Sequence, residues 1–566
     1  MFFSAYVGPE SGHATWEAVV TAHARWLGCE VSLQTVPTAA GTTRAIARIG
    51  QIGLDGAIAG SANWVTLAAQ DAAFDVRVPP TSPQHCYTLT AFRGRVLTDD
   101  LRLCAALTGA KLDPVGVYAL LLYGSTPPPF TVLRGVTRLA GGHTYRVDVD
   151  TIKATRDFVP DAAPTTDGAV AEHRVAAVLD RLIGSLPANA LLFFSGGVDS
   201  ALLAARAARL GRRDLQLLNY AFSPSDPEAA HALRVASHLK LACERVAHDE
   251  ARMTDVLGRF AADYAFPFGD LSTLPTNVLV HAALSDGRGG STRPVAALEG
   301  TGADGAFGLS AGYRRYQRVF DMPRVFRTAG DAAYRWLRLW RRNTYLERAL
   351  RFVRKSTRMR MGPAVMAHSA LDGIAFDVPA DFRAGLSERL GQEIDAFGES
   401  ASAEERLSLL DLAWVCAGRM APKTFDPLRS RGVRTIYPYL EPELVQASTS
   451  VTWGVKSARG QAKALLKTVL ARDLPASLVY RAKSGFTPPY RTTLGSAPLQ
   501  AFLHDVVLAA DNPLLEWCDP RVIRDLVTRA GGRAELSVGA VDFLWALTFA
   551  SGWVRQLPSR QPRHAA

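Results

Sequence analysis

The chain has 566 residues, 48% of them hydrophobic, which is enough to form at least two cores of ordinary domain size. It has no apolar run of about 18 residues and no signal-peptide pattern at its start, so we expect a cytoplasmic protein with no membrane partner. The six cysteines lie far apart without a C-x-x-C pair, which argues against a zinc site and a disulfide framework.

The positive charge is concentrated in one segment. Residues 311–360 have a net charge of +12, whereas the rest of the chain sums to −1. Aromatic and leucine residues recur there at roughly helical spacing, which predicts amphipathic helices with a solvated Arg face. The alternative is a docking surface for an acidic peptide, a nucleic acid or a nucleotide phosphate.

The first part of the chain is typical of a β-rich domain. Short alternating runs such as "HCYTLTAF" and "HTYRVDV" predict strands. They end before residues 158–168, a linker rich in Pro, Thr, Asp and Gly. We therefore predict one domain over residues 1–158 and a second over residues 169–566.

After the linker, the pattern changes to alternating strands and helices. The predicted order is strand 191–194, helix 199–210, strand 215–223, helix 227–239, strand 243–248 and, after a loop, strand 295–299. This βαβαβ unit predicts a parallel sheet with its ligand site at the carboxyl ends of the strands. Residues 362–555 are expected to be mainly helical.

The turn "SGGVDS", residues 195–200, lies between the first of these strands and its helix. Two glycines and a helix N-terminus present backbone N–H groups to one point, which predicts a phosphate or pyrophosphate site. The Walker pattern G-x-x-x-x-G-K-[ST] is absent, so this is not the loop of a γ-phosphate-transferring enzyme.

A second glycine-rich loop follows the strand at 295–299, in "VAALEGTGADGAFG". It contains a formal G-x-G-x-x-G, but Arg-rich helical sequence follows instead of a second strand ending in an acid, so a dinucleotide site is disfavoured. A nucleophile elbow around Ser310 ranks lower still, because no strand directly precedes that serine.

Together these motifs resemble two known groups. The first loop resembles the pyrophosphate loop of ATP pyrophosphatases, which cleave ATP between the α- and β-phosphates to adenylate a substrate. The second is similar to the G-x-G-A-D-E-x-F-x-G loop of asparagine synthetases, with Gly305 in place of the second acid. The segments "YPYLEPELVQ", "KALLK" and "LPASLVYRAKSGFTPPY" continue this resemblance.

The resemblance implies ATP and Mg²⁺ as cofactors and assigns roles to individual residues. Asp199 and Asp304 would be the two Mg²⁺ ligands and, with Lys463 and Lys483, the catalytic set; a cation on the loop of Lys483 would stabilise charge in the transition state. Contacts to the nucleotide and pyrophosphate are implied for Phe194, Ser195, Gly196, Gly197, Val198, Asp199, Ser200, Phe222 and Gly302.

The N-terminal domain resembles the class II glutaminase of amide-forming synthetases in this family, an Ntn-like β-sandwich. That domain uses a cysteine directly after the initiator Met, whereas this sequence reads Met1-Phe2-Phe3. We therefore expect an inactive glutaminase-like domain, and an amine that arrives with the substrate. The fold class expected is α/β plus α+β: this sandwich, then an ATP-pyrophosphatase domain with a parallel sheet and a helical extension.

Two branches of the family combine a degenerate glutaminase with an adenylating domain: β-lactam synthetases and lasso-peptide macrolactam synthetases (lasso cyclases). The first use a Tyr–Glu pair as base, but Thr301 stands at the tyrosine's place and Glu347 is the one glutamate in the Arg-rich stretch after it. That departure, with the Arg-rich segment, favours a lasso cyclase. It would adenylate an Asp or Glu side chain of a precursor peptide, and the peptide's N-terminal amine would close the ring.

This interpretation implies a precursor peptide as substrate, with a leader peptidase and a leader-recognition protein as partners. The alternatives are an amide ligase acting on a small substrate, a tRNA-modifying ATP pyrophosphatase and a non-catalytic scaffold. The tRNA-modifying enzyme is disfavoured by the other motifs, so nucleic acid is not an expected partner. The sequence leaves open the peptide's identity, the ring size, the base that takes the amine proton and the oligomeric state.

Overall fold

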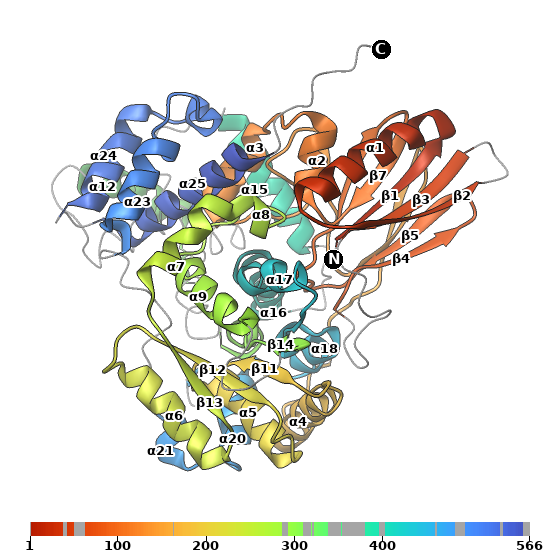
Figure 1. Ribbon diagram of the computed structural model, residues 1–566. Helices are drawn as coiled ribbons and strands as arrows, with labels where there is room; N and C mark the ends of the chain where they lie inside the picture. Colours follow the sequence, from red (N-terminus) through yellow and green to blue (C-terminus); the bar gives the residue numbers. More distant parts are fainter. Residues whose placement is uncertain are drawn as a thin grey trace.

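Three sheets organise the part of the chain that the structure describes, and helices pack against two of them, one antiparallel and one parallel (Figure 1). The computed structural model describes residues 2–37, 42–49, 63–161, 163–285, 293–308, 318–319, 322–337, 353, 380–395, 402–458, 461–481, 493–532 and 536–557. Two of the sheets are antiparallel and come from the first 156 residues, and the third is parallel. The mixed α/β organisation expected from the sequence is confirmed.

The two antiparallel sheets pack face to face. The six-stranded sheet has the order β2-β3-β1-β7-β6-β8, from β1 (Phe2–Pro9), β2 (Val31–Pro37), β3 (Thr42–Ile49), β6 (Tyr87–Ala91), β7 (Gly94–Thr98) and β8 (Val136–Arg138). The four-stranded sheet has the order β10-β9-β5-β4, from β4 (Thr66–Gln70), β5 (Ala73–Val78), β9 (His143–Val147) and β10 (Ile152–Arg156). Inward residues of β1 and β5, such as Val7 and Phe74, form the core between them. Helix α1 (Glu10–Trp26) covers the outer face of the larger sheet with Trp16.

The parallel sheet has the order β13-β12-β11-β14-β15. Its strands are β11 (Ala190–Phe193), β12 (Gln216–Ala221), β13 (Cys243–Ala247), β14 (Ala296–Leu298) and β15 (Arg434–Ile436). Helices α5 (Val198–Arg209) and α6 (Pro227–Leu239) connect the first three strands, so the predicted βαβαβ unit is confirmed. Strand β15 lies within a region expected to be mainly helical; with three residues it is too short to leave a periodic signal.

Some helices cover this sheet, others lie between it and the N-terminal sheets, and a further group lies away from the parallel sheet, at the top left of Figure 1. These three groups include α2 (Leu101–Thr108), α3 (Pro114–Tyr123), α4 (Gly168–Gly184), α7 (Glu250–Asp255), α8 (Phe260–Asp263), α9 (Thr273–Leu284), α10 (Ala303–Phe307), α12 (Arg324–Leu337), α15 (Ala380–Asp395), α16 (Ala403–Leu410), α17 (Pro422–Arg429), α18 (Pro442–Thr449), α19 (Trp453–Lys456), α20 (Ala464–Leu470), α21 (Ala476–Val479), α23 (Ala497–Phe502), α24 (Pro520–Gly531) and α25 (Val538–Gln556). Within the described ranges, none of the helices combines the length and apolarity needed to cross a membrane.

Helix α12 confirms the helical prediction for its part of the Arg-rich segment 311–360. Apart from residues 318–319, 322–337 and 353, that segment lies outside the described residues. All six cysteines are described, and none forms a disulfide, as the sequence predicts.

A buried ionic network links the N-terminal sheets to the rest of the molecule. Arg102 at the start of α2 pairs with the neighbouring Asp100 at 2.8 Å and donates to the Ala261 carbonyl, also at 2.8 Å. Arg429 of α17 pairs with Asp99 at 2.7 Å. Because Arg102 and Asp100 are fully buried, the arginine keeps the pKa of the Asp100 carboxyl far below its usual range, against the effect of burial.

We predict that Arg102→Met lowers the free energy of unfolding by about 3–5 kcal/mol, because it leaves the Asp100 charge buried without its main partner. Urea unfolding followed by circular dichroism measures this. Arg181→Met is the matched control: Arg181 is half exposed in its pair with Glu443 and should contribute less than about 1 kcal/mol. Equal losses in the two variants would contradict the prediction.

Candidate active site

The glycine turn after β11 is closed by its own side chains. The hydroxyls of Ser195 and Ser200 lie 3.2 Å apart, and the Gly197 N–H donates to Ser195 Oγ at 3.3 Å. Gly196 has a φ of +70°, and a Cβ there would lie 2.6 Å from the Cα of Ala232 in α6. Glycine is therefore required at this position, and the turn is shaped to present the N-terminus of α5 to an anion.

Asp199 and Asp304 come together around one lysine. The Lys463 ammonium lies 2.8 Å from both carboxylate oxygens of Asp199 and 2.7 Å from Asp304 Oδ1. Asp199 follows β11 and Asp304 follows β14, so neighbouring strands deliver both carboxylates to the same edge of the sheet. The structure therefore brings together three of the four residues that the sequence assigned to catalysis.

Lys463 reaches this position through an uncommon backbone conformation. It has a φ of +57°, directly before α20, and its N–H donates to the Phe307 carbonyl at 3.1 Å. A non-glycine residue in this region is strained, and such strain persists where the surroundings impose it, often at functional sites. Burial alone would lower the pKa of the Lys463 ammonium, but Asp199 and Asp304 together raise it above its ordinary value. The lysine therefore stays charged at neutral pH.

The loops after β14 and β15 support this arrangement. Gly302 has a φ of +107°, and a Cβ there would lie 2.7 Å from a methyl carbon of Leu440. The Tyr439 hydroxyl donates to the Asp199 carbonyl at 3.0 Å. The segment "YPYL" thus contacts both glycine loops, through Leu440 at Gly302 and through Tyr439 at Asp199.

The remaining predicted nucleotide contacts surround the same edge. Val198 is the first residue of α5, and Phe222 directly follows β12, with its ring against Tyr220. The Phe194 side chain is 2% exposed and belongs to the core, so only its backbone faces the turn.

Lys483 lies outside the described residues. The segment that leads to it is anchored by Arg481, which forms an ion pair with Glu228 of α6. Because Gly196 packs against the same helix, the ion pair holds Arg481 on the helix that also contacts the glycine turn.

The carboxylates fit a magnesium site. Mg²⁺ is usually held by one or two carboxylates together with substrate phosphates, and it does not need a cage of protein ligands. Asp199 and Asp304 share a single cation, the Lys463 ammonium, so both already face a position that suits positive charge. In the described parts of the chain no cluster of three or more potential metal ligands is present.

Sequence reasoning missed Asp411, the first residue of the π-helix Asp411–Met420. Its carboxylate lies 2.7 Å from the position that a Cβ would take at Gly305, where the family motif has its second acid. Burial raises the pKa of the Asp411 carboxyl to about 6, and nearby Asp304 adds to the increase. Asp411, which is far from Gly305 in the sequence, thus places a carboxylate beside the position where the family motif has an acid. The local sequence around Gly305 does not indicate this.

Glu299 was also missed. It ends the strand predicted at 295–299, and its carboxylate accepts hydrogen bonds from Thr301 Oγ1 at 2.6 Å and from the Thr424 hydroxyl. Glu347, considered above as a partner for residue 301, lies outside the described residues. The sequence did contain a signal for Glu299, since an acidic residue there ends a predicted strand and directly precedes a glycine loop.

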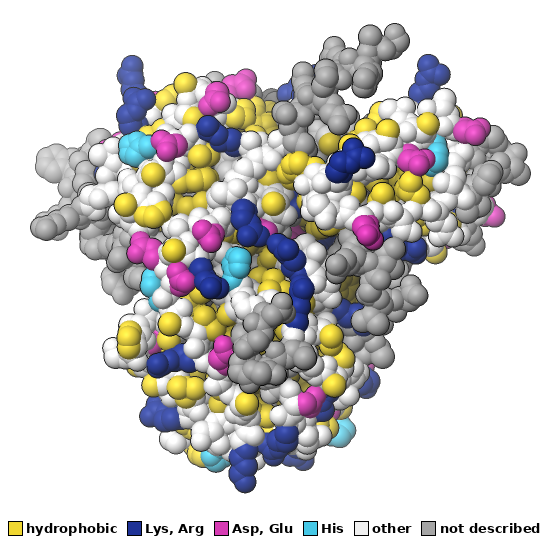
Figure 2. All heavy atoms as spheres, viewed as in Figure 1, with side chains coloured by type: hydrophobic (Ala, Val, Ile, Leu, Met, Phe, Trp, Pro, Cys, Tyr) yellow, Lys and Arg dark blue, Asp and Glu magenta, His cyan; other side chains and the backbone are white. Residues whose placement is uncertain are grey.

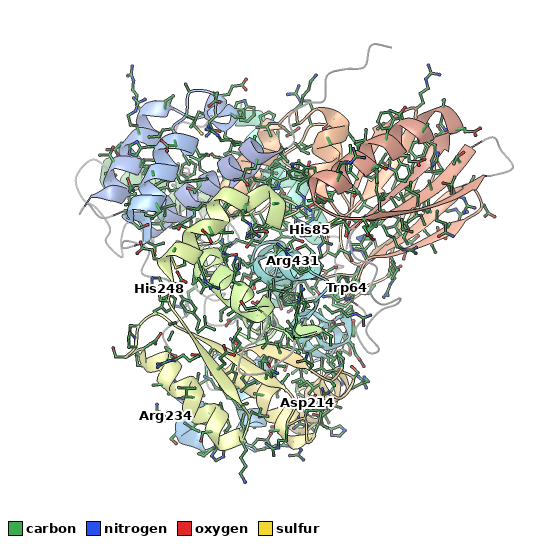
Figure 3. All side chains as sticks on the ribbon, viewed as in Figure 1. Trp64, His85, Asp214, Arg234, His248 and Arg431 are labelled. Carbon is green, nitrogen blue, oxygen red and sulfur yellow. The ribbon has the colours of Figure 1, made fainter. Side chains whose placement is uncertain are left out.

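A cavity of about 240 Å³ lies at the opposite edge of the parallel sheet. Arg293 and Arg431, which precede β14 and β15, line it with Arg259. On the face shown in Figure 2, Lys and Arg side chains gather in the middle of the molecule, and Figure 3 places Arg431 there. Because it opens at the amino ends of these strands, this cavity is separate from the site around Lys463.

Comparisons with known proteins support the family resemblance of the two glycine loops. The family model described as asparagine synthase matches residues 169–551, which is more than half of the chain. Proteins from Mycobacterium bovis and from two strains of Mycobacterium tuberculosis, provisionally named glutamine-hydrolyzing asparagine synthetases, are 26% identical over 444 residues. The alignment covers 74% of this chain and 64% of each relative, so the chain spans less than two thirds of their length.

We predict that Asp411→Asn stabilises the protein at pH 8 by on the order of 2 kcal/mol and that the gain disappears toward pH 4. A carboxyl whose folded-state pKa is raised to about 6 stabilises the fold in acid, and this contribution is lost as the pH rises through that value. Urea unfolding of both proteins at pH 4, 6 and 8 measures the difference. A gain that is independent of pH would contradict the assignment of the shift to this residue.

Proposed function

Because the chain belongs to the asparagine synthase family, we propose that it is an ATP-dependent ligase that adenylates a carboxyl group and joins it to an amine. The observation that carries this proposal is the Lys463 ammonium held between Asp199 and Asp304, beside a glycine turn that opens a helix. That arrangement suits the cleavage of ATP between its α- and β-phosphates, with pyrophosphate as the leaving group.

The residues of the glycine turn and around Lys463 each have a defined task in this reaction. The N–H groups at the start of α5, with Ser195 and Ser200, bind the pyrophosphate, because they converge where a helix N-terminus favours negative charge. Lys463 neutralises charge that accumulates on the phosphates. Asp199 and Asp304 would hold Mg²⁺, which when bound supplies further charge screening.

The amine is proposed to come with the substrate rather than from glutamine. Burial raises the pKa of the thiols of Cys86, directly before β6, and of Cys104 in α2, so these two cysteines stay protonated at neutral pH. The ring of Phe2 packs between the guanidinium groups of Arg102 and Arg429, 4.7 and 4.1 Å from its centroid. An aromatic ring thus fills the start of β1, and β1 contains no cysteine.

For the substrate, we propose a peptide whose own N-terminal amine attacks its adenylated Asp or Glu side chain, so that the protein forms a macrolactam as a lasso cyclase does. A leader peptidase and a leader-recognition protein would be its partners. The positive charge of residues 311–360 favours such a long, acidic substrate. The names of the mycobacterial relatives favour a second candidate, an amide ligase that acts on a small amino acid.

Mass spectrometry separates these two candidates. The protein is incubated with ATP and Mg²⁺, and either with peptides translated from the open reading frames that flank its gene or with aspartate and ammonium. Loss of one water from a peptide, with release of AMP and pyrophosphate, is the expected result. Asparagine formation would favour the small-substrate ligase, and ADP as the product would contradict adenylation altogether.

We predict that Asp199→Asn and Lys463→Met each lower pyrophosphate release by about 10²-fold or more, because each removes charge that faces the phosphates. Lys467→Met is the matched control, since it lies on the same helix, α20, without contacting Asp199 or Asp304 in the described structure. A pyrophosphate-release assay at saturating ATP measures the rates. Equal activity of Lys463→Met and Lys467→Met would contradict the role of Lys463.

A further inference from the structure

A partly exposed carboxylate, Glu299, lies at the catalytic edge of the sheet without a task in the reaction described above. It directly follows β14, the strand that leads to Asp304, and Gly300 separates it from the next residue of the glycine loop. A Cβ at Gly300 would lie 3.2 Å from the Cβ of Asp199, so Glu299 adjoins the pyrophosphate turn. Its backbone position is therefore fixed by the same strands that position the adenylating residues.

Two hydroxyl groups orient the Glu299 carboxylate. Thr301 Oγ1 donates to Oε1 at 2.6 Å, and the Thr424 hydroxyl donates to Oε2. Thr424 Oγ1 also lies 2.7 Å from the hydroxyl of Tyr437, which donates to the Ala421 carbonyl at 2.8 Å. The two hydroxyls thus hold the carboxylate in one orientation, and its remaining lone pairs stay available to a further donor.

The surroundings of this carboxyl group raise its pKa and so favour uptake of a proton. Burial raises the pKa of Glu299 above its ordinary value, and Asp270 adds to the increase, while Lys423 and the two threonines oppose it. Lys423 itself donates to Ser272 Oγ at 2.6 Å and lies 3.5 Å from Asp270 Oδ2. A base is most effective when its pKa lies near the working pH, and a raised carboxyl pKa moves it in that direction.

The other acidic residues of the site have different contacts. Asp199 and Asp304 both contact Lys463 and face the phosphates. Asp411 lies against the backbone of Gly305, and the Cys416 thiol donates to it at 3.4 Å. Thr301 has no group that titrates near neutral pH. Within the described residues of this edge, Glu299 and Asp411 are both partly open to solvent and free of a lysine or arginine ion pair. Asp411 lies beside Gly305 and the Cys416 thiol, whereas Glu299 is held by the hydroxyl groups of two threonines.

On the premise that the proposed function is correct, we propose that Glu299 is the catalytic residue that accepts the proton of the attacking amine. The amine nitrogen forms a bond to the acyl carbon, the bond between that carbon and the AMP oxygen breaks, and AMP leaves with the electron pair. The proton lost by the nitrogen passes to the Glu299 carboxylate and then to solvent. No oxidant, reductant or further reactant is needed.

Hydroxylamine separates this step from adenylation. It is a strong nucleophile that is mostly unprotonated at neutral pH, so it captures an acyl-adenylate without help from a base. We predict that Glu299→Gln lowers amide formation with the natural amine by about 10²-fold or more. Hydroxamate formation with the same carboxyl substrate, and exchange of labelled pyrophosphate into ATP, should change by less than about threefold, because the adenylation site is untouched.

The pH profile and a conservative variant add two independent readouts. Amide formation by the unchanged protein should increase with pH through the pKa of Glu299, and this acid limb should be absent in Glu299→Gln. Glu299→Asp should recover part of the activity, since it keeps the carboxylate. Glu443→Gln, at a half-exposed glutamate paired with Arg181, serves as the matched control and should behave as the unchanged protein.

Two results would overturn this role, and a third would overturn the function on which it rests. If Glu299→Gln keeps full amide formation, the residue takes no proton; if it loses amide and hydroxamate formation equally, it is structural. If the unchanged protein shows neither pyrophosphate exchange nor hydroxamate formation with any peptide or amino acid tested, adenylation itself is wrong.

Discussion

The arrangement of the site depends on one electrostatic contact, the ammonium of Lys463 between the carboxylates of Asp199 and Asp304. Two acids brought close together repel each other, and a shared cation makes their approach favourable. The lysine is 11% exposed and adopts a left-handed backbone conformation to reach them, so the fold accepts strain at this point. The loops after β11 and β14 are held in place by the same contact.

The parallel sheet determines which chemistry is possible at this place. Because β11, β14 and β15 are adjacent and parallel, the segments that follow them meet at one edge, although residues 193 and 437 are far apart in the sequence. The glycine turn at residues 195–200, the loop of Asp304 and the "YPYL" segment each supply one part of the site. The N-terminal sheets contact this assembly through buried charges such as Asp99 with Arg429, which makes them a structural support for the site.

Much of this could be predicted from local sequence. Strands β11 to β13 and helices α5 and α6 have clear periodicity, and Gly196 and Gly302 mark turns that the structure explains by positive φ values and close packing. Strand β15 was not predicted because three residues are too few to show a hydrophobic period. Its partner strand, β14, also comes from a distant part of the chain. Asp411 and Glu299 were missed for a related reason: their importance depends on Gly305 and Thr424, which only the fold brings beside them. The division into residues 1–158 and 169–566 stays a prediction, since the largest hydrophobic cluster includes residues such as Phe2 and Trp545 from both parts.

In the proposed reaction, a carboxyl oxygen of the substrate becomes bonded to the α-phosphorus of ATP. Isotope transfer tests this most directly: a peptide or amino acid that supports turnover is labelled with ¹⁸O in its reacting carboxyl group, and the nucleotide product is analysed by mass spectrometry. We expect AMP that carries one ¹⁸O atom for each amide formed. Label in inorganic phosphate, with ADP as the nucleotide product, would show an acyl phosphate instead and would contradict the account.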